Sequence, residues 1–384
     1  MTFSKRIQIT FLLAACFVPN NAIAQATTPI RVAIVGLVHG HVQGFLHNLP
    51  AHPEITLVGI SEPDPALRQR YIDRTHLPAN LFFPTEAAML QATHPQAILV
   101  YTSTVGHRAA IEQAAPLHIA AMVEKPLATT IEDALAIQQL AQKYNVAVLT
   151  NYETTWYASN TAANDLLTNG KIGDLRKIVV HDGHNGPKEI GVGPEFLNWL
   201  TDPKQNGGGA LFDFGCYGVD LATWIMHGEL PLTVSAVTLH VKPQVYPNVD
   251  DDSTIILTYP HMQAIIQGSW NWPFSRKDME LYGATGYIDT LYEDKAPGAK
   301  LRIRLQGESS EHVEEAPTLA PPQDNSLNYL AAVLHGNLNP QHDLTSLDTN
   351  ITVVRILDAA RKSAQTGRTV VLAPSSNTSK GTMK

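Results

Sequence analysis

Two side chains that could move a proton stand four residues apart near the start of a predicted helix. They are Asp213 and Tyr217, and this spacing places them on one helix face. A free phenol has a pKa of about 10, so a tyrosine acts as a base at neutral pH only beside a positive charge. Lys125, at the end of a predicted strand, carries such a charge. The alternative is structural: Asp213 caps the helix and Tyr217 packs as a half-buried aromatic.

Strands and helices alternate over the first 150 residues. Strands are predicted at five apolar runs, residues 30–35, 55–60, 97–102, 119–123 and 146–150. Thr130 and Asp133 match a capping box for a helix that ends near Tyr144. Repeated strand–helix units indicate an α/β fold with a parallel, doubly wound sheet, which binds ligands beyond the carboxyl ends of its strands. Glu124 and Lys125 directly follow the fourth run, at that edge.

The segment after the first strand matches a dinucleotide-binding turn in part. It reads Gly-Leu-Val-His-Gly-His from Gly36, so only Gly36 is in register with the GxGxxG pattern. A shifted turn through Gly40 would restore the geometry and place Val38, His39 and Gly40 against a pyrophosphate at the helix N-terminus. The alternative is a purely structural turn.

An acidic residue follows the second strand. Glu62 stands 26 residues after Gly36, where a carboxylate would accept hydrogen bonds from an adenosine ribose. Its charge would repel a 2′-phosphate, so NAD is favoured over NADP. The alternative is that residues 62–64 cap the next helix, and the nearby Arg68 and Arg70 complicate the choice between NAD and NADP.

Two longer motifs carry a resemblance to a known family. Residues 122–128 read Met-Val-Glu-Lys-Pro-Leu-Ala, and residues 207–220 read Gly-Gly-Gly-Ala-Leu-Phe-Asp-Phe-Gly-Cys-Tyr-Gly-Val-Asp. They resemble the Glu-Lys-Pro turn and the GGG-x3-D-x-G-x-[HY] helix start of the glucose–fructose oxidoreductase/inositol dehydrogenase (Gfo/Idh/MocA) family. The segment from Thr102 to His107 resembles the family's ATP…H loop, and residues 283–288 resemble its GTeG strand. The resemblance covers about residues 30–372.

The resemblance implies a fold of two domains. A Rossmann domain is expected at residues 28–150, and a C-terminal α/β domain with a large, open, mostly antiparallel sheet at residues 151–372. In the second domain, alternating patterns predict strands at residues 233–240, 253–259, 262–270 and 302–305. The last helix, at about residues 347–365, is expected to pack near the first domain.

The resemblance also implies a nicotinamide-dependent oxidoreductase that acts on a sugar or polyol hydroxyl. Tyr217 stands where many family members place a catalytic histidine, and it would remove a hydroxyl proton as hydride passes to the nicotinamide. Lys125 would lower the pKa of Tyr217 and hold the same oxygen, and Asp213 would orient either group. Cofactor contacts are expected from four residues, Thr102, His107, Glu124 and Lys125.

Substrate contacts are expected from two segments. Glu153 and Trp156 follow the sixth strand of the family fold, where they could bind a sugar by a hydrogen bond and by stacking. His184 is a candidate ligand of a sugar hydroxyl; the alternative is a surface histidine.

No metal is predicted, because His39 and His41 lie on the presumed pyrophosphate loop and no acidic residue or cysteine completes a set at ligand spacing. The acidic run at residues 250–252 is expected to be a solvated bend.

The amino-acid composition argues against some classes of binding partner for this protein. The chain has 384 residues, with 27 Lys and Arg against 35 Asp and Glu, so its net charge is −8. No basic cluster is present, which argues against nucleic-acid binding. Hydrophobic residues make up 44% of the chain, enough for a sizeable core. The resemblance adds the expectation of a homo-oligomer, formed through the open sheet.

The first 24 residues are predicted to be a signal peptide. Lys5 and Arg6 precede an apolar run too short to span a bilayer, and cleavage is expected after Ala24. A lipid on Cys16 is the alternative. The mature protein is therefore expected to be periplasmic or secreted and to lack a membrane span, and residues 373–384 are predicted to form a disordered tail.

Three functions remain open from the sequence. The first is an exported oxidoreductase that holds its NAD tightly, because free NAD is scarce outside the cytoplasm. The second is a glycosidase of the same fold that uses NAD transiently, in an oxidation followed by elimination. The third is a catalytically silent sugar-binding protein, which the imperfect glycine turn supports.

Overall fold

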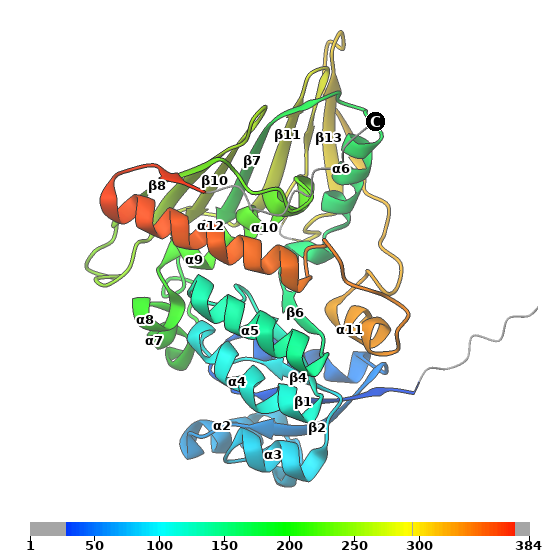
Figure 1. Cartoon of the computed structure of the whole chain (residues 1–384), viewed down its shortest axis with the longest axis vertical. Helices are drawn as coiled ribbons and strands as arrows, with labels where there is room; N and C mark the ends of the chain where they lie inside the picture. Colours follow the sequence, from blue (N-terminus) through cyan, green and yellow to red (C-terminus); the bar gives the residue numbers. More distant parts are fainter. Residues whose placement is uncertain (1–27, 294, 373–384) are drawn as a thin grey trace, which may run out of the picture.

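Residues 28–293 and 295–372 are described by the structure, which is a computed structural model. The predicted signal peptide, the alternative lipid site at Cys16 and the predicted tail lie outside these residues. The described chain forms two sheets, each with its own helices (Figure 1). Within this part of the chain, no helix is both long and apolar enough to cross a membrane.

The first sheet has six parallel strands in the order β3-β2-β1-β4-β5-β6. The strands are β1 (Ile30–Val35), β2 (Ile55–Ser61), β3 (Phe82–Phe83), β4 (Ala97–Val100), β5 (Ala120–Glu124) and β6 (Val148–Asn151). The helices are α1 (His41–Asn48), α2 (Pro65–Thr75), α3 (Glu86–Thr93), α4 (His107–Ala114) and α5 (Ile131–Tyr144). Short 3₁₀ turns lie at Leu49–Ala51, Ala79–Leu81, Thr104–Gly106 and Ala115–Leu117. The predicted Rossmann domain is confirmed, and only the two-residue β3 was too short to give a pattern.

Local sequence explains two of the helix starts. Thr130 Oγ1 accepts a hydrogen bond from the Asp133 N–H at 3.2 Å, so the predicted cap of α5 is confirmed. Asp64 Oδ1 accepts from the Ala66 N–H at 2.8 Å and caps α2. The strands between these helices are buried at nearly every position, as expected for a parallel sheet covered on both faces.

The second sheet has nine strands in the order β14-β13-β12-β11-β7-β10-β9-β8-β15, and β7 and β10 are its parallel pair. The strands are β7 (Leu175–Gly183), β8 (Thr233–Leu239), β9 (Asp252–Thr258), β10 (Gln263–Ser269), β11 (Arg276–Gly283), β12 (Gly286–Asp289), β13 (Lys300–Leu305), β14 (His312–Glu315) and β15 (Val370–Val371). The helices after the first sheet in the chain are α6 (Ala158–Thr168), α7 (Pro194–Leu200), α8 (Pro203–Asn206), α9 (Ala210–Asp213), α10 (Gly215–Ile225), α11 (Ser326–Leu334) and α12 (Leu347–Thr366), with a 3₁₀ turn at Glu153–Trp156. Of these, α11 packs in the core of the first domain. This large, mostly antiparallel sheet confirms the predicted second domain.

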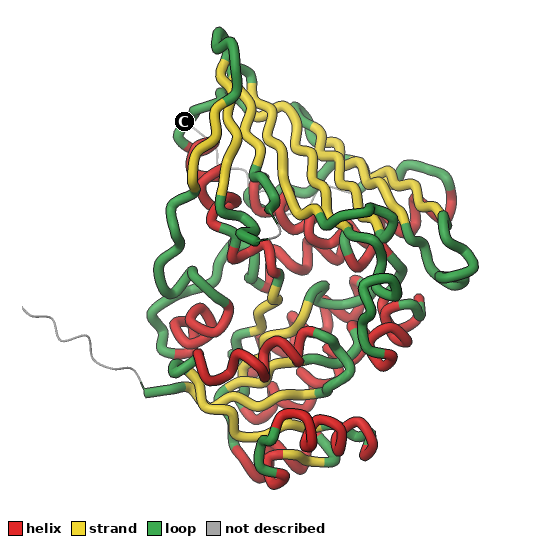
Figure 2. Tube along the Cα trace, turned by 180° about the vertical axis from the view of Figure 1, so that it is seen from behind, coloured by secondary structure: helices red, strands yellow, loops and turns green. Residues whose placement is uncertain are grey.

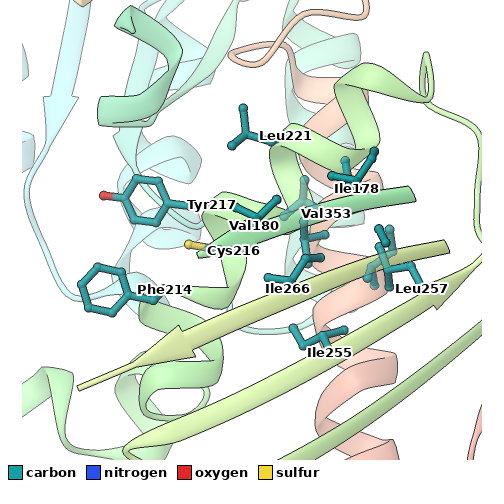
Figure 3. Close-up of a cluster of buried hydrophobic side chains, with 14 of the residues drawn as sticks. Ile178, Val180, Phe214, Cys216, Tyr217, Leu221, Ile255, Leu257, Ile266 and Val353 are labelled. Carbon is teal, nitrogen blue, oxygen red and sulfur yellow. The ribbon is translucent and has the colours of Figure 1, made fainter. Parts of the chain in front are cut away.

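The two faces of the second sheet differ. Buried residues alternate along β9 and β10, and this buried face packs against α10 and α12 (Figure 2). The cluster in Figure 3 joins the sheet to these helices through Ile178, Val180, Ile255, Leu257, Ile266, Cys216, Tyr217 and Val353. On the opposite face, Val237 and Leu239 of β8 are 64% and 54% exposed. The expected homo-oligomer through this face stays a prediction.

Helix α12 belongs to both domains. Ile351 and Val354 pack in the core of the first domain, and Ile356 packs in the core of the second. Asp358 Oδ2 accepts a hydrogen bond from the Ile131 N–H at 2.9 Å. The prediction that the last helix packs near the first domain is confirmed.

The acidic run at residues 250–252 corrects one expectation, because it is not a solvated bend. Asp251 is fully buried and accepts hydrogen bonds from the Val241 and Lys242 N–H groups at 2.7 and 2.6 Å. Asp250 accepts from the Gly209 N–H at 2.9 Å. These carboxylates satisfy backbone donors of two turns, which outweighs their tendency to face water.

Candidate active site

A cavity of about 370 Å³ lies where the two domains meet. From the first domain it is lined by Gly40, His41, Gln43 and Lys125. From the second domain it is lined by His184, Pro187, Ile190, Gly191, Val192, Gly193, Phe196, Leu200, Asp213, Phe214, Tyr217 and Lys277. Five predicted site residues, Gly40, Lys125, His184, Asp213 and Tyr217, therefore line one cavity.

Lys125 and Asp213 form a buried ion pair in the wall of this cavity. Lys125 Nζ lies 2.5 Å from Asp213 Oδ1 and donates a second hydrogen bond to the Asp213 carbonyl oxygen at 2.9 Å. Burial alone would lower the pKa of Lys125 and raise that of Asp213, but each opposite charge outweighs burial. The pKa of Lys125 is therefore raised and that of Asp213 lowered, so the pair is ionised at neutral pH.

The polypeptide around Asp213 is fixed by close contacts. Gly209 precedes α9 where an added Cβ would lie 1.8 Å from the Asp250 carbonyl oxygen, so no larger residue fits there. Trp270 Nε1 donates a hydrogen bond to Asp213 Oδ2 at 2.9 Å. One carboxylate oxygen is thus bound by Trp270 and the other by Lys125, which orients the ion pair.

Tyr217 lies between two ammonium groups. The Nζ atoms of Lys125 and Lys277 lie 5.0 and 4.9 Å from the centre of its ring. Burial raises the pKa of Tyr217 well above its ordinary value, and the charges of Glu153 and Asp213 raise it further. The expected lowering of this pKa by Lys125 is wrong, because burial, the largest cause, and the nearby negative charges raise the pKa. Tyr217 is a protonated hydrogen-bond donor at neutral pH.

The second ammonium group belongs to an ion pair that the motifs did not reveal. Lys277 on β11 is paired with Glu153, which also accepts a hydrogen bond from the Tyr157 hydroxyl at 2.6 Å. Burial would raise the pKa of Glu153, but the Lys277 charge outweighs it and lowers the pKa. Glu153 thus reaches the site through Lys277, which lines the cavity.

His184 is part of the cavity wall and not a surface histidine. Its Nδ1 accepts a hydrogen bond from the Gly186 N–H at 2.8 Å, and its ring meets Phe214 edge-on. Burial lowers the pKa of His184, so the ring is neutral at pH 7. Because Nδ1 is an acceptor here, the proton is assigned to Nε2, which can donate to a ligand oxygen.

Trp156 is not among the residues that line the cavity. Its indole Nε1 donates to Asn151 Oδ1 at 3.1 Å, and its ring packs against Tyr329 of α11. The structure therefore gives Trp156 a packing role where the sequence predicts stacking on a sugar. The position after β6 is correct, but the side chain points into the helix packing of the first domain.

The glycine turn after β1 has the tight geometry expected of a nucleotide-binding turn. Gly36 has φ +83°, and an added Cβ would lie 2.8 Å from Thr102 Cγ2. A Cβ added at Gly40, the N-cap of α1, would lie 3.1 Å from Phe196 Cδ1 of α7. The Val38 carbonyl oxygen accepts a hydrogen bond from Trp199 Nε1 at 3.2 Å. Helix α7 of the second domain therefore packs directly on the turn.

Glu62 holds this turn in place by hydrogen bonds. Its carboxylate is buried and accepts hydrogen bonds from the Leu37 and Asp64 N–H groups at 2.8 and 2.9 Å. Burial raises the pKa of Glu62. The predicted ribose acceptor is thus also a brace between β2 and the turn, and the cap of α2 comes from Asp64.

Glu124 makes a contact that sequence spacing conceals. Its Oε2 lies 3.0 Å from His41 Nδ1, and its Oε1 accepts a hydrogen bond from Asn151 Nδ2 at 3.3 Å. His39, His41 and Glu124 each offer one ligand atom, and these atoms lie within 4.8 Å of one another. The expectation that no acidic residue completes a ligand set with the two histidines is therefore wrong, because β5, two strands away from β1 in the sheet, brings Glu124 close to them.

His107 holds the turn that carries Lys125. It is buried at the start of α4, and its Nδ1 hydrogen bonds to the Leu127 carbonyl oxygen at 3.2 Å. Burial lowers the pKa of His107 to about 4, so the ring is neutral and Nδ1 is the donor. Its Nε2 is buried without a partner among the described residues. A cofactor contact by His107 stays a prediction.

Three site residues had no motif to mark them. Lys277 and Trp270 lie in or after strands of the second sheet, and Asn151 ends β6. One general rule could have drawn attention to Lys277. A lysine whose side chain is buried between a strand and a helix needs a carboxylate partner. Its partner Glu153 is 124 residues away, so the pair cannot be read from spacing.

Comparison with known proteins agrees with this geometry. The family model described as the oxidoreductase family with an NAD-binding Rossmann fold matches residues 30–152, and that of the GFO/IDH/MocA C-terminal domain matches residues 161–289. The chain belongs to the Gfo/Idh/MocA oxidoreductase family. The resemblance inferred from the sequence motifs is confirmed.

Individual members of the family are distant. The chain is 26% identical over 282 residues to a dTDP-3,4-didehydro-2,6-dideoxy-alpha-D-glucose 3-reductase of Saccharopolyspora spinosa, covering 73% of this chain and 80% of the reductase. An aldose–aldose oxidoreductase of Caulobacter crescentus, solved with glycerol, is 23% identical with a TM-score of 0.74, over 90% of this chain and all of that one. An inositol dehydrogenase homolog of Azotobacter vinelandii, solved with NAD+, is 18% identical with a TM-score of 0.76, over 90% and 98% of the two chains. At these identities the two structures establish the fold alone.

Proposed function

We propose that this protein is an NAD-dependent oxidoreductase that interconverts a hydroxyl and a carbonyl group of a sugar or polyol. The observation that carries the proposal is the ionised Lys125–Asp213 pair beside the protonated Tyr217, all in one cavity. The family membership and the sugar reductase among its relatives support the same class of substrate.

The first domain fits the nicotinamide cofactor. Gly36 at φ +83° provides a turn that brings backbone N–H groups close to a phosphate, and the turn lies at the N-terminus of α1. Thr102 packs against this turn, and Glu62 braces it. When bound, the cofactor supplies or accepts the hydride. A buried carboxylate at residue 62 favours NAD over NADP, because a 2′-phosphate would be repelled.

The site residues would transfer the proton to or from the substrate oxygen and stabilise the negative charge that develops on it. Lys125 Nζ donates two hydrogen bonds to Asp213 and keeps a third proton for a substrate oxygen. Tyr217 stays protonated, so it donates a proton to the oxygen of a carbonyl substrate during reduction. In the reverse direction it accepts that proton only as its phenolate, which the two flanking ammonium groups stabilise. His184 Nε2 can donate a further hydrogen bond to a substrate hydroxyl.

Export and tight binding of the cofactor are part of the proposal. The predicted signal peptide would place the protein where free NAD is scarce, so the cofactor must remain bound through successive reactions. Helix α7 supports this, because Phe196 and Trp199 pack across the glycine turn and would restrict release. Such an enzyme oxidises one sugar and reduces a second.

The test is to denature purified protein and identify any released nucleotide by mass spectrometry. We expect about one equivalent of NAD(H). A first sugar should reduce the bound NAD, and a second sugar should reoxidise the bound NADH without added cofactor. A protein that carries none and binds none, as measured by calorimetry, would overturn the enzyme proposal and leave the sugar-binding alternative. Release of an aryl group from a glycoside without net cofactor change would show the glycosidase instead.

A further inference from the structure

We propose that the groove between α1 and α2 is a second binding site, which takes a small molecule that carries a carboxylate or phosphate group. The groove holds a cavity of about 600 Å³, against about 370 Å³ for the cavity where the two domains meet. Cavities of this size are typical of small-molecule sites in proteins. The groove is lined in part by Gln43, Gly44, Leu46, His47, Tyr71 and Arg74.

The groove lies away from the proposed cofactor site. In a doubly wound sheet, the helices begin at the edge that binds a nucleotide and run back along the sheet. The glycine turn precedes α1 and Glu62 precedes α2, whereas His47 lies in the last turn of α1 and Arg74 in the last turn of α2. Bound NAD would therefore leave the groove open.

Tyr71 provides a buried hydrogen-bond donor at the groove. Its side chain is 3% exposed, and its hydroxyl makes no hydrogen bond within the described part of the chain. Burial raises the pKa of Tyr71, and the nearby Gln43 amide and the Arg74 charge lower it only in part, so the hydroxyl stays protonated. Because a buried hydroxyl without a partner is unfavourable, an oxygen atom of a ligand would stabilise this side chain.

Arg74 gives the groove its positive charge. Its guanidinium group is paired with no carboxylate among residues 28–293 and 295–372, whereas Arg70, one turn earlier in α2, is paired with Glu195 at 3.2 Å. No aspartate or glutamate stands among the described residues that line the groove. A free guanidinium group donates two parallel hydrogen bonds to a carboxylate or a phosphate, which determines the class of ligand.

Gly44 leaves one wall of the groove open. It lies inside α1, where glycine makes a helix less stable than alanine does. The packing does not require a glycine here, because an added Cβ would have no atom within 4 Å outside its own turn of helix. The missing side chain exposes the backbone of α1 to the groove, so a ligand can lie flat against the helix between His47 and Tyr71.

The test uses the full-length protein saturated with NAD, so that any phosphate site of the cofactor is already filled. Calorimetric titrations measure the binding of inorganic phosphate and, separately, of citrate. We expect one equivalent of at least one of them to bind, and the tighter probe shows whether the ligand carries a phosphate or a carboxylate. The readout is binding and not turnover, so it is independent of the oxidoreductase proposal.

Variants locate the bound anion. Arg74→Gln should weaken its binding by about 10–100-fold, because a charged hydrogen bond is lost, and Tyr71→Phe by about 2–10-fold. Gly44→Leu should block the groove while α1 remains folded, because leucine favours helix. Gln43 is left unchanged, since it also lines the catalytic cavity.

The matched control is Arg70→Gln, which removes the same charge from the same helix but from an arginine that already has a partner. It should bind the anion as the wild type does, and circular dichroism should show that every variant is folded. The proposal is overturned if neither anion binds, or if saturation with NAD abolishes the binding. Equal weakening by Arg70→Gln and Arg74→Gln would overturn it too, because the attraction would then be unspecific.

Discussion

Two ion pairs flank Tyr217, and they differ in how firmly they are held. Lys125 and Asp213 are 7% and 8% exposed, and Asp213 is bound by Trp270 as well as by the lysine. In the other pair, Lys277 is 14% exposed but Glu153 is 45% exposed. The first pair joins the two domains, whereas both residues of the second follow the first sheet in the chain.

The difference in burial means that the Lys125 ammonium group is held in one position, whereas the Lys277 ammonium group can move more easily. Breaking a buried pair leaves an uncompensated charge in a medium of low dielectric constant, which is strongly destabilising. Breaking a pair with an exposed partner costs little, because water replaces the lost interaction. If the proposed function is correct, we therefore expect Lys125 to stabilise the transition state and Lys277 to position the substrate.

The largest effect is expected from Lys125→Met. Turnover should fall by up to about 10³-fold, because a donor to the reacting oxygen is lost. The free energy of unfolding should fall by about 3–5 kcal/mol, because Asp213 stays buried without its partner. Steady-state kinetics on a panel of aldoses and polyols and urea unfolding measure the two effects. Full turnover in this variant would refute the assignment of Lys125.

Tyr217→Phe should lower turnover by about 10²-fold while the ring remains between the two ammonium groups. No hydrogen bond from the Tyr217 hydroxyl is found within the described residues, so stability should change by less than about 1 kcal/mol. The control is Tyr152→Phe, since Tyr152 packs edge-on against Tyr217 and its buried hydroxyl has no partner among the residues that the structure describes. Equal turnover of both variants would show that the phenol takes no part in proton transfer.

The pH dependence of stability distinguishes the first pair from Glu86, a buried acid that accepts a hydrogen bond from the Gln113 amide at 3.0 Å. The folded-state pKa of Asp213 lies below 3.8, so its contribution to stability is present above that pH and is lost as the pH falls through the folded pKa. Burial raises the pKa of Glu86 to about 8, so Glu86 destabilises the fold increasingly as the pH rises from 4.5 to 8. Glu86→Gln should raise the free energy of unfolding at pH 9 relative to pH 4, with a slope of about 1.4 kcal/mol per pH unit inside that window. Urea unfolding at the two pH values measures it, and an unchanged difference would contradict the shift.

The smallest effect is expected from Lys277→Met. Its partner Glu153 is exposed, so stability should change by about 0–1 kcal/mol. If Lys277 positions the substrate, KM should rise several-fold while kcat stays near that of the wild type. A loss of kcat as large as that of Lys125→Met would remove the distinction between the two pairs.

The sequence was sufficient for elements set by local pattern. Buried runs and the Thr130 cap predicted the first sheet and α5, and the Glu-Lys-Pro and triple-glycine motifs placed Lys125 and Asp213 correctly. These signals work because each depends on residues close together in the chain.

Contacts between distant segments escaped prediction. Glu124 meets His41 from 83 residues away, and Lys277 meets Glu153 from 124 residues away. The direction of the Tyr217 pKa shift was also missed, because burial is its largest cause and the burial of this ring is not apparent from the sequence. Burial and charge pairing are properties of the assembled fold, so residue types alone do not determine them.

The position of α12 near the end of the chain affects the order in which the active site can assemble during translation. Arg361 Nη1 donates to the Thr129 carbonyl oxygen at 3.0 Å and to the Gly207 carbonyl oxygen at 3.2 Å. One late side chain thus fastens the segment after Lys125 to the segment before Asp213. On the ribosome, the two halves of the ion pair are fastened together only after translation has reached α12, and the core of the first domain also waits for Ile351 and Val354 of this helix. A nascent chain that stops short of α12 is expected to lack both the complete core of the first domain and the fastened ion pair.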